Sequence, residues 1–487
     1  MQSAVLQIGK EAPKLSQDAA SRSLNGAEPS SDEETWMAAF RRHGLEWLDP
    51  TKRRALTALM IRVAGAAIAY VMQIVLAQWL GLAEYGVFVG VWVWLLVLGG
   101  IAPLGFNISA IGLLSTYKGA GDFDRWRGLL VASVAMAVGA GLLLSGIGWV
   151  ALYAMPGLVS SQYLMPVWLC LFCLPLMALG DINEGVARAH GWMNAALVPI
   201  YLLRPILLIG GLFIAMLAGA TPDAALAMAM AIMACLVAVL MQAAVIVIGL
   251  KKIAGWGALS MTPGIWLYGA LPIVVVQTFE LIMQNFDMLA ISYFLGAEAT
   301  GIYFAALKTI ALLTFVNFAV GAATANQVAS LHANDQRVEL GELISGAINL
   351  SFWPTLFGAL VIVLLAPFLL SLFGDDFVAH AYLTAVLAIG FVAKSFVGPA
   401  ELYLNVLGQQ KICALVFLVA AVLNMLLNII LIPLFGLLGA AIATSTALVG
   451  LSVGLFFITK QRIGVTLCPT VPITSLKKIA RCLQPSA

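Results

Sequence analysis

Residues 223–252 read DAALAMAMAIMACLVAVLMQAAVIVIGLKK, and this stretch predicts a membrane-spanning helix. No charged side chain occurs between Asp223 and Lys251. About 20 residues of this kind, rising about 1.5 Å each, are enough to cross the hydrocarbon core of a bilayer. The acidic residue at one end and the lysines at the other also orient the span, because cytoplasmic loops are enriched in Lys and Arg.

The same character extends over most of the chain. Of the 487 residues, 62% are hydrophobic and only 10% are charged, and the mean hydropathy is +1.01. Soluble globular domains are close to half apolar and a quarter charged, so that class is excluded. We expect an all-α polytopic membrane protein with about twelve spans, in two six-helix bundles around a central cavity. The predicted spans are 55–80, 86–116, 128–155, 163–187, 192–219, 223–250, 265–295, 299–330, 342–373, 379–407, 411–433 and 436–459.

The connections between the spans are short, which leaves no room for a soluble catalytic domain and predicts that the protein is not an enzyme. The net charge of +2 and the lack of a long Lys/Arg block argue against nucleic-acid binding. Cys170 and Cys173 have no His or further Cys at ligand spacing, so we expect helix packing there rather than a metal site, and we expect no cofactor. Gly99-Gly100 and Pro103 predict bends within span 86–116.

The loops between the spans predict the orientation. With the N-terminus in the cytoplasm, the cytoplasmic loops contain Lys118, Arg125, Arg127, Arg188, Lys251, Lys252, Arg337 and Lys411. The opposite loops contain no Lys or Arg. An even number of spans returns the C-terminus to the cytoplasm, and the first span, rather than a cleaved signal, directs insertion.

The chain divides into five predicted segments. They are a polar cytoplasmic tail (1–54), a first six-helix bundle (55–250), a linker (251–264), a second bundle (265–459) and a C-terminal cytoplasmic tail (460–487). Residues 31–48 have the pattern of a short amphipathic helix on the membrane surface, or of a disordered tail. Leu80-Gly81 and Gly86-Val87-Phe88 recur, with the same internal spacing, as Leu295-Gly296 and Gly301-Ile302-Tyr303. Copies with equal orientation predict a parallel repeat, as in transporters with a central cleft.

We single out ten ionisable residues that lie within the predicted spans or, for Arg188, directly after one; a central charge in a span costs roughly 2.5–3.5 kcal/mol if it is exposed to lipid. They are Arg62, Asp181, Glu184, Arg188, Arg204, Glu280, Asp287, Lys308, Lys394 and Glu401. Arg62 and Arg188 lie near span ends, where long side chains reach the interface. Asp287 and Lys308 have similar depths and form either a structural ion pair or part of a transport site.

The span 265–295 carries a polar stripe. Gln277, Glu280, Gln284 and Asp287 follow an i, i+3, i+7, i+10 pattern, which places them on one side of a helix. Such a stripe lines an aqueous cavity or binds neighbouring helices together through hydrogen bonds, and we favour the cavity.

Three motifs resemble those of a known family. They are FDMLAISYFLGAEATGIYFAALK (286–308), its counterpart QWLGLAEYGVF (78–88) and LIPLFGLLGAAIAT (431–444). Residues 55–460 resemble the polysaccharide translocases (Wzx-like O-antigen or exopolysaccharide flippases) of the MATE-like exporter superfamily. The resemblance implies that the protein moves undecaprenyl-diphosphate-linked oligosaccharides from the cytoplasmic to the periplasmic leaflet of a bacterial inner membrane, by alternating access.

The resemblance also suggests roles for the polar residues within the spans. A lipid diphosphate needs cations, for which we expect Arg62, Arg204, Lys308 and Lys394. The sugar-contacting, cavity-lining residues that we expect are Asn107, Gln277, Gln284, Asn285 and Asn317. Glu280, Asp287, Asp181 and Glu401 are the positions for coupling to H⁺ or Na⁺. Expected partners are the lipid-linked oligosaccharide, membrane lipids, and a polysaccharide polymerase or glycosyltransferase.

Three alternatives remain open at this point. A cation-coupled multidrug exporter of the same superfamily would favour a carboxylate-dominated cavity. A major-facilitator carrier also has two six-helix halves, and Gly121-Asp-Phe-Asp124-Arg125-Trp-Arg127 lies where that family has an acidic-basic signature, although the glycine spacing differs by one. A membrane polysaccharide polymerase or ligase has similar hydropathy, but usually carries a large external loop with basic residues.

Overall fold

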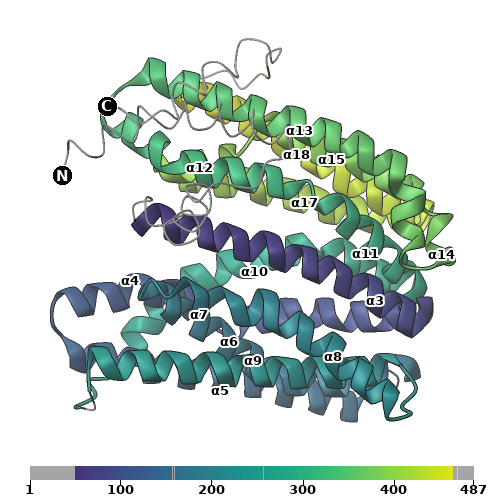
Figure 1. Cartoon of the computed structure of the whole chain (residues 1–487), viewed down its shortest axis with the longest axis horizontal. Helices are drawn as coiled ribbons and strands as arrows, with labels where there is room; N and C mark the ends of the chain where they lie inside the picture. The colour runs from purple at the N-terminus through teal and green to yellow at the C-terminus, as the bar shows by residue number, and fades with distance from the viewer. Residues whose placement is uncertain (1–49, 156, 158, 256, 464–468, 470–487) are drawn as a thin grey trace, which may run out of the picture. The chain divides into compact units, whose positions relative to one another are not determined.

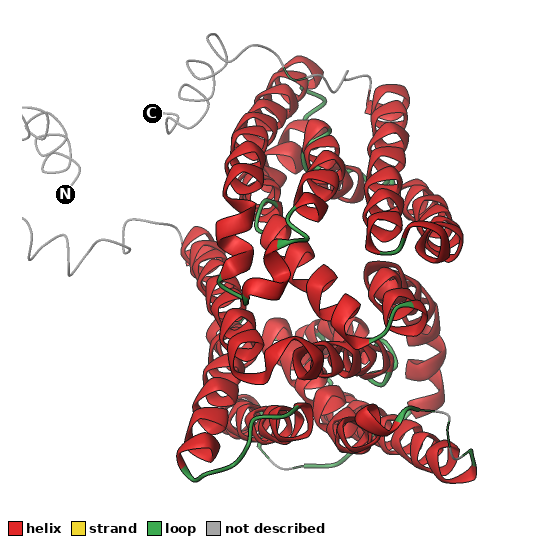
Figure 2. Ribbon diagram, turned by 90° about the vertical axis from the view of Figure 1, so that its right-hand side faces the viewer, coloured by secondary structure: helices red, strands yellow, loops and turns green. Residues whose placement is uncertain are grey.

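A computed structural model describes residues 50–463 and 469, apart from 156, 158 and 256. The predicted amphipathic segment and nearly all of the C-terminal tail lie outside the described residues. The residues from Thr57 onward belong to one compact unit, and the following description concerns that unit. Its described part consists of helices and their connecting loops, without a β-strand (Figure 2).

The helices confirm an all-α polytopic membrane protein. In chain order they are α3 (Pro50–Ile101), α4 (Phe106–Gly119), α5 (Phe123–Ala154), α6 (Ser161–Ala189), α7 (Met193–Val198), the π-helix η1 (Pro199–Leu203), α8 (Arg204–Leu217), α9 (Ala224–Ile253), α10 (Pro263–Phe294), α11 (Ala297–Ala311), α12 (Thr314–Ala333), α13 (Arg337–Ser371), α14 (Asp375–Val378), α15 (Tyr382–Phe396), α16 (Ala400–Val406), α17 (Gln410–Phe435) and α18 (Leu437–Ile463). Among the described residues, 11 helical stretches are long and apolar enough to cross a membrane. The first, Thr57–Gly119, contains two of the predicted spans, so all twelve are accounted for.

Two glycines at the predicted repeat share one unusual backbone conformation. Gly81 has φ 76° and ψ 167°, which interrupts α3. Gly296, its counterpart in the second copy, has φ 86° and ψ −168° and precedes α11. Glycine adopts this positive φ without the steric penalty of a Cβ atom. The repeat therefore extends from sequence to backbone geometry.

Several helices are interrupted within the spans. The predicted bend near Pro103 is present, because α3 ends at Ile101 and α4 begins at Phe106 after positive φ angles at Leu104 and Gly105. Further breaks separate α11 from α12, separate α15 from α16, and create η1 before Arg204. These three breaks were not predicted from the sequence.

The helices pack mainly within two groups, with α3 and α10 between them (Figure 1). In one group α6 contacts α4, α5 and α9, while in the other α18 contacts α15 and α17. Helix α10 contacts both groups, through α4 and α5 on one side and α17 and α18 on the other. Helix α3 reaches the second group through a 3.0 Å hydrogen bond between the hydroxyls of Tyr70 and Thr309.

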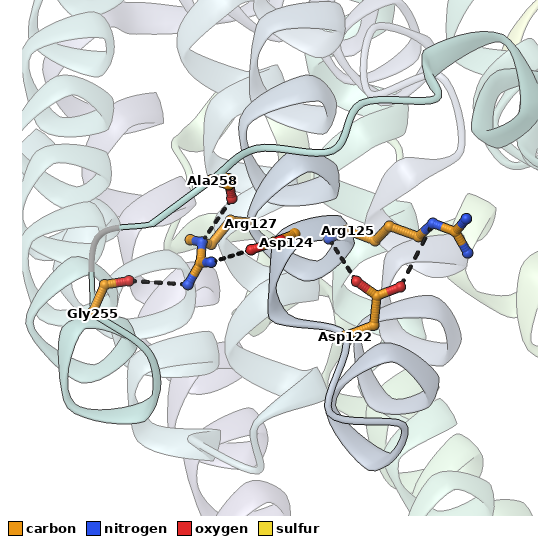
Figure 3. A network of polar contacts seen from close by, with 6 residues as sticks. All are labelled: Asp122, Asp124, Arg125, Arg127, Gly255 and Ala258. Atoms are coloured by element: carbon orange, nitrogen blue, oxygen red, sulfur yellow. Dashed lines mark hydrogen bonds and ion pairs between the residues drawn. The ribbon is translucent and has the colours of Figure 1, made fainter.

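The segment between α9 and α10 is fastened to the start of α5 (Figure 3). Arg127 donates from Nε to the Ala258 carbonyl at 3.1 Å and from Nη1 to the Gly255 carbonyl at 3.2 Å. The same guanidinium pairs with Asp124. Gly128 allows the approach, because a Cβ there would lie 2.1 Å from the Ser260 carbonyl oxygen. The acidic-basic motif at 121–127 therefore anchors the linker.

Candidate functional site

A cavity of about 1040 Å³ lies between α3, η1, α8, α11, α12, α13, α15 and α16. Six of the predicted site residues line it: Arg62, Arg204, Lys308, Lys394, Asn317 and Glu401. All four predicted phosphate-binding cations are therefore brought together, although they come from four different helices. The Oδ1 atom of Asn317 is buried and has no hydrogen-bond partner among the described residues.

One end of the helices is closed by direct backbone contact, and we call it the Gly86 end. A Cβ on Gly86 would lie 2.0 Å from the Ala297 carbonyl oxygen, and a Cβ on Gly301 would lie 3.3 Å from the Gly86 Cα atom. Only glycine allows this approach at position 86. The loop before α9 lies at the same end, since Glu84 accepts a 2.8 Å hydrogen bond from the Ala224 N–H. The positive-inside rule predicts that this is the outer end.

Three of the cations occupy one depth in the cavity, and we call them the cation tier. Lys308 lies about three helical turns after Ala297, where α11 begins, and Lys394 lies a similar distance after Tyr382, where α15 begins. Arg204 begins α8, whose other end, Leu217, is toward the Gly86 end. At about 1.5 Å per residue, each cation is about 16–20 Å from the Gly86 end. Arg62 lies further toward the opposite end of α3.

Aromatic rings hold most of the cations. The Arg62 guanidinium lies 5.0 Å from the ring centroid of Phe318 and 5.9 Å from that of Tyr201. The Arg204 guanidinium carbon lies 5.4 Å from the ring centroid of Trp92. Lys308 Nζ lies 4.8 Å from the ring centroid of Phe304. Such contacts orient a cation without neutralising its charge.

The cations of the cavity have few acidic partners. Within the described part of the chain, no carboxylate oxygen forms an ion pair with Arg62, Arg204 or Lys308. Lys394 is the exception, because its Nζ lies 3.5 Å from a Glu401 carboxylate oxygen. The lining therefore presents four cations against one carboxylate among the described residues.

The π-helix η1 positions Arg204. The Arg204 N–H donates to the Pro199 carbonyl rather than to that of residue 200. This wider turn places Ile200, Tyr201 and Arg204 along the cavity. Gly65 lets α3 approach η1, since a Cβ there would lie 2.6 Å from the Tyr201 Cβ. Single π-turns of this kind often occur at functional sites.

The polar stripe of α10 lies outside this cavity, contrary to the expectation that it lines one. Asp287 is buried at 4% exposure, where it accepts a 3.4 Å hydrogen bond from Thr444 of α18. It makes no ion pair with Lys308 among the described residues. Glu280 and Gln284 are exposed elsewhere, and Glu280 lies close enough to Glu401 for electrostatic repulsion. Of the stripe, Asp287 faces α18, and hydropathy alone does not specify such a rotation of a helix.

The other predicted site residues are also absent from the lining. Asn285 donates a 2.8 Å hydrogen bond to the Leu281 carbonyl in its own helix. Gln277 has an unpartnered Oε1 atom among the described residues but does not border the cavity. The backbone of Asn107 packs against Gly185 of α6. Asp181 lies behind the cavity wall, close enough to Arg204 to interact electrostatically.

Four residues that line the cavity were not predicted as site residues from the sequence: Tyr70, Gln73, Trp92 and Tyr201. Rings and amides are common within membrane spans, so they do not stand out as the charges do. The signal available was spacing, because Arg62, Ala66, Ala69 and Gln73 recur at intervals of four, three and four. That periodicity defines one helix face.

No group of three or more His, Cys, Asp or Glu residues suited to a metal ion occurs among the residues that the structure describes. Cys170, Cys173, Cys235 and Cys413 are free and buried. Cys170 and Cys173 both face the core of α6 and its neighbours, as expected for packing residues.

Comparison with known proteins adds sequence and fold relationships. The MatE family profile matches residues 272–430. The probable low-salt glycan biosynthesis flippase Agl15 of Haloferax volcanii is 28% identical over 162 residues, which are 33% of this chain and 34% of that protein. The probable flippase AglR of the same organism is 26% identical over 165 residues, 32% of this chain and 34% of that protein. The matched segment thus spans about one third of these relatives.

The whole fold matches solved transporter structures. An inward-facing multidrug resistance MATE family transporter of the MOP superfamily superposes with a TM-score of 0.68 at 16% identity, over 84% of this chain and 98% of that chain. This protein is therefore a multi-pass membrane protein with the MATE transporter fold, not an enzyme fold. That result sets aside the major-facilitator and the polymerase or ligase alternatives.

Proposed function

We propose that this protein is a flippase for lipid-linked oligosaccharides, which it moves across a membrane by alternating access. The supporting observation is the cavity itself, where four cations face one carboxylate among the described residues. A lipid diphosphate carries its negative charge at the junction of lipid and glycan, so it must cross the low-dielectric layer near cations. Two relatives named as probable flippases, one of them for glycan biosynthesis, support this choice of substrate.

We propose a transport cycle that is consistent with the geometry. With the Gly86 end closed, Arg62 lies nearest the opposite end of the cavity and meets an entering headgroup first. The cation tier then holds the diphosphate at mid-depth, with two Lys and one Arg supplying charge-assisted hydrogen bonds. Closure of the entry end and separation at Gly86 and Ala297 would release the headgroup outside. A membrane potential, negative inside, assists by about 2.3 kcal/mol per charge per 100 mV.

The remaining proposals concern the setting of the transporter. We place it in a bacterial inner membrane with both termini cytoplasmic, exporting undecaprenyl-diphosphate-linked units toward a surface-polysaccharide polymerase. For coupling to H⁺ or Na⁺, the carboxylates nearest the cation tier are Glu401, which is paired with Lys394, and Asp181 beside Arg204. Glu280 and Asp287 remain part of this coupling proposal through their proximity to Glu401 and Lys308.

A multidrug exporter is the second candidate, because the superposed MATE structure is described as a multidrug resistance transporter. Cationic drugs require a cavity of opposite charge. The lining cations argue against that substrate class here.

The test uses the full-length protein reconstituted in vesicles with a fluorescent polyprenyl-diphosphate-linked oligosaccharide. Flipping is measured by quenching with a membrane-impermeant reductant. Arg204→Gln and Lys308→Gln remove one charge each from the tier, and each should slow flipping by about 10- to 100-fold, because a charge-assisted hydrogen bond contributes about 1.5–3 kcal/mol. Lys411→Gln removes an equal charge outside the cavity and should have no effect.

Two results would contradict the proposal. One is flipping by the double variant Arg204→Gln/Lys308→Gln at the wild-type rate, with equal protein in the vesicles. The other is efflux of a cationic dye by the wild type without movement of the glycolipid, which would identify a multidrug exporter.

A further inference from the structure

We infer that the part of the cavity between the cation tier and the Gly86 end is a sugar-binding chamber, formed by Gln73, Phe88, Trp92 and Phe304. This inference rests on the proposed flippase function and adds the orientation of the substrate: the glycan points toward the Gly86 end, the diphosphate lies at the tier and the lipid chain leads back toward the bilayer. All four residues line the cavity.

These residues lie nearer the Gly86 end along their helices than the cations do, and two of their rings, those of Trp92 and Phe304, contact the charged groups of the tier. Gln73 lies about two helical turns before the break at Gly81 in α3, and Trp92 lies somewhat less than two turns after Gly86. At about 1.5 Å per residue, they lie about 9–12 Å from the closed end, against about 16–20 Å for the tier. A headgroup whose phosphates are held at the tier therefore has this chamber beyond it.

The side chains of the chamber match the chemistry of a sugar. A sugar ring has hydroxyls at its edge and apolar C–H faces, so it binds where amides or hydroxyls lie beside aromatic rings. Trp92 and Phe88 stack on each other with centroids 5.9 Å apart and planes inclined by 18°. At the depth of the tier, Tyr70 adds a hydroxyl that is bonded to Thr309, and a hydroxyl oxygen can accept a second hydrogen bond.

Gln73 is the specific polar group of the chamber. It is 6% exposed, and its Oε1 atom accepts a 3.1 Å hydrogen bond from the buried Tyr85 hydroxyl. The other side of the amide, its NH₂ group, has no partner within the described part of the chain. Tyr85 thus acts as a positioning residue that holds the Gln73 NH₂ as a donor for a sugar hydroxyl.

The arrangement favours a glycosylated substrate. Once a headgroup displaces water from the cavity, an NH₂ group without a partner is destabilising, and a sugar hydroxyl would satisfy it. A polyprenyl diphosphate without sugar would leave it unpaired. The chamber therefore discriminates between glycosylated and bare lipid, whereas the tier binds both.

The experiment compares two substrates in the same vesicles of full-length protein: a polyprenyl-diphosphate-linked oligosaccharide and the same polyprenyl diphosphate without sugar. Initial flipping rates over a concentration series give KM and the maximal rate for each lipid. The variant is Gln73→Leu/Tyr85→Phe, which removes both polar partners together and so avoids leaving either one buried alone. Tyr85→Phe alone frees the amide to turn, and Arg204→Gln serves as the tier variant.

We expect the double variant to raise KM for the glycolipid by about 2- to 10-fold, the effect of one hydrogen bond, and to leave the values for the sugar-free lipid unchanged. Tyr85→Phe should give a smaller change of the same kind. Arg204→Gln should impair both lipids. Equal impairment of both lipids by the double variant, or no change in either, would overturn the chamber. If the wild type moved neither lipid, the proposed function itself would fail.

Discussion

The contact between Gly86 and Ala297 makes a quantitative prediction about the closed end of the cavity. Adding one methyl group in Gly86→Ala would place a Cβ 2.0 Å from the Ala297 carbonyl oxygen and 2.4 Å from its carbonyl carbon. These neighbours are backbone atoms at the start of α11, so they cannot turn away as a side chain would. Overpacking of this kind costs about 1–3 kcal/mol.

That cost applies only when the Gly86 end is closed, so it should shift the equilibrium between conformations. A difference of about 1–3 kcal/mol changes the ratio of open to closed forms by about 5- to 150-fold. The assay introduces Ala69→Cys, a cavity-lining position, and measures its labelling by an impermeant maleimide added from the Gly86 side. Labelling of Cys introduced at position 69 should be greater in the protein that also carries Gly86→Ala than in the protein with Ala69→Cys alone. Labelling of the native cysteines, measured without Ala69→Cys, is subtracted from both values.

Alanine substitutions at two other glycines serve as comparisons for Gly86→Ala. Gly301→Ala should have an intermediate effect, because its nearest atoms lie 3.2 to 3.4 Å away. Gly139→Ala in α5 has no atom within 4 Å of the added Cβ, so it should label like the parent. If Gly86→Ala and Gly139→Ala labelled equally, the Gly86 contact would not be part of the closed seal.

Two further predictions concern the opposite end. Gly128→Ala would place a Cβ 2.1 Å from the Ser260 carbonyl oxygen and should destabilise the packing of the linker against α5 by about 1–3 kcal/mol, measured as faster tryptic cleavage after Lys251 or Lys252. The control Gly112→Ala, which has no atom within 4 Å of the added Cβ, should be cleaved at the wild-type rate. Equal cleavage rates for the two variants would argue against the anchor. Burial lowers the pKa of His190, and the nearby charge of Lys118 lowers it further. The hydrogen bond to the Val186 carbonyl acts in the opposite direction and raises the pKa. The folded protein thus favours neutral His190, whose contribution is present above the unfolded pKa of about 6.5 and is lost as the pH falls. The thermal midpoint should fall less between pH 7.5 and 5.5 in His190→Gln than in the exposed control His332→Gln, and identical slopes would exclude His190 as the source.

The spans, the bend near Pro103 and the repeat were predictable because they depend on quantities that a sequence carries directly. Hydrocarbon thickness sets the length of an apolar run, and the positive φ of Gly81 and Gly296 requires glycine. The break that forms η1 was not predictable, because one shifted backbone hydrogen bond at Arg204 leaves hydropathy unchanged.

The site was predictable in part for a related reason. A charge inside a span is costly, so Arg62, Arg204, Lys308 and Lys394 stand out, and all four line the cavity. The stripe on α10 was not placed by the sequence: residue spacing tells which side chains share a face, whereas packing with neighbouring helices decides where that face points. Tyr70 and Gln73 carry no such cost and were identified only by their position in the fold.

The Gly86 seal also relates the two copies of the repeat to each other. Gly86 and Gly301 occupy the same place in the two copies, and they lie against each other. In a symmetric dimer, residues on the twofold axis meet their own counterparts in the partner. The seal therefore has the geometry of a homodimer contact within one polypeptide. The cavity beyond it is not symmetric, because the first copy supplies Gln73 and Arg204 while the second supplies Lys308 and Lys394.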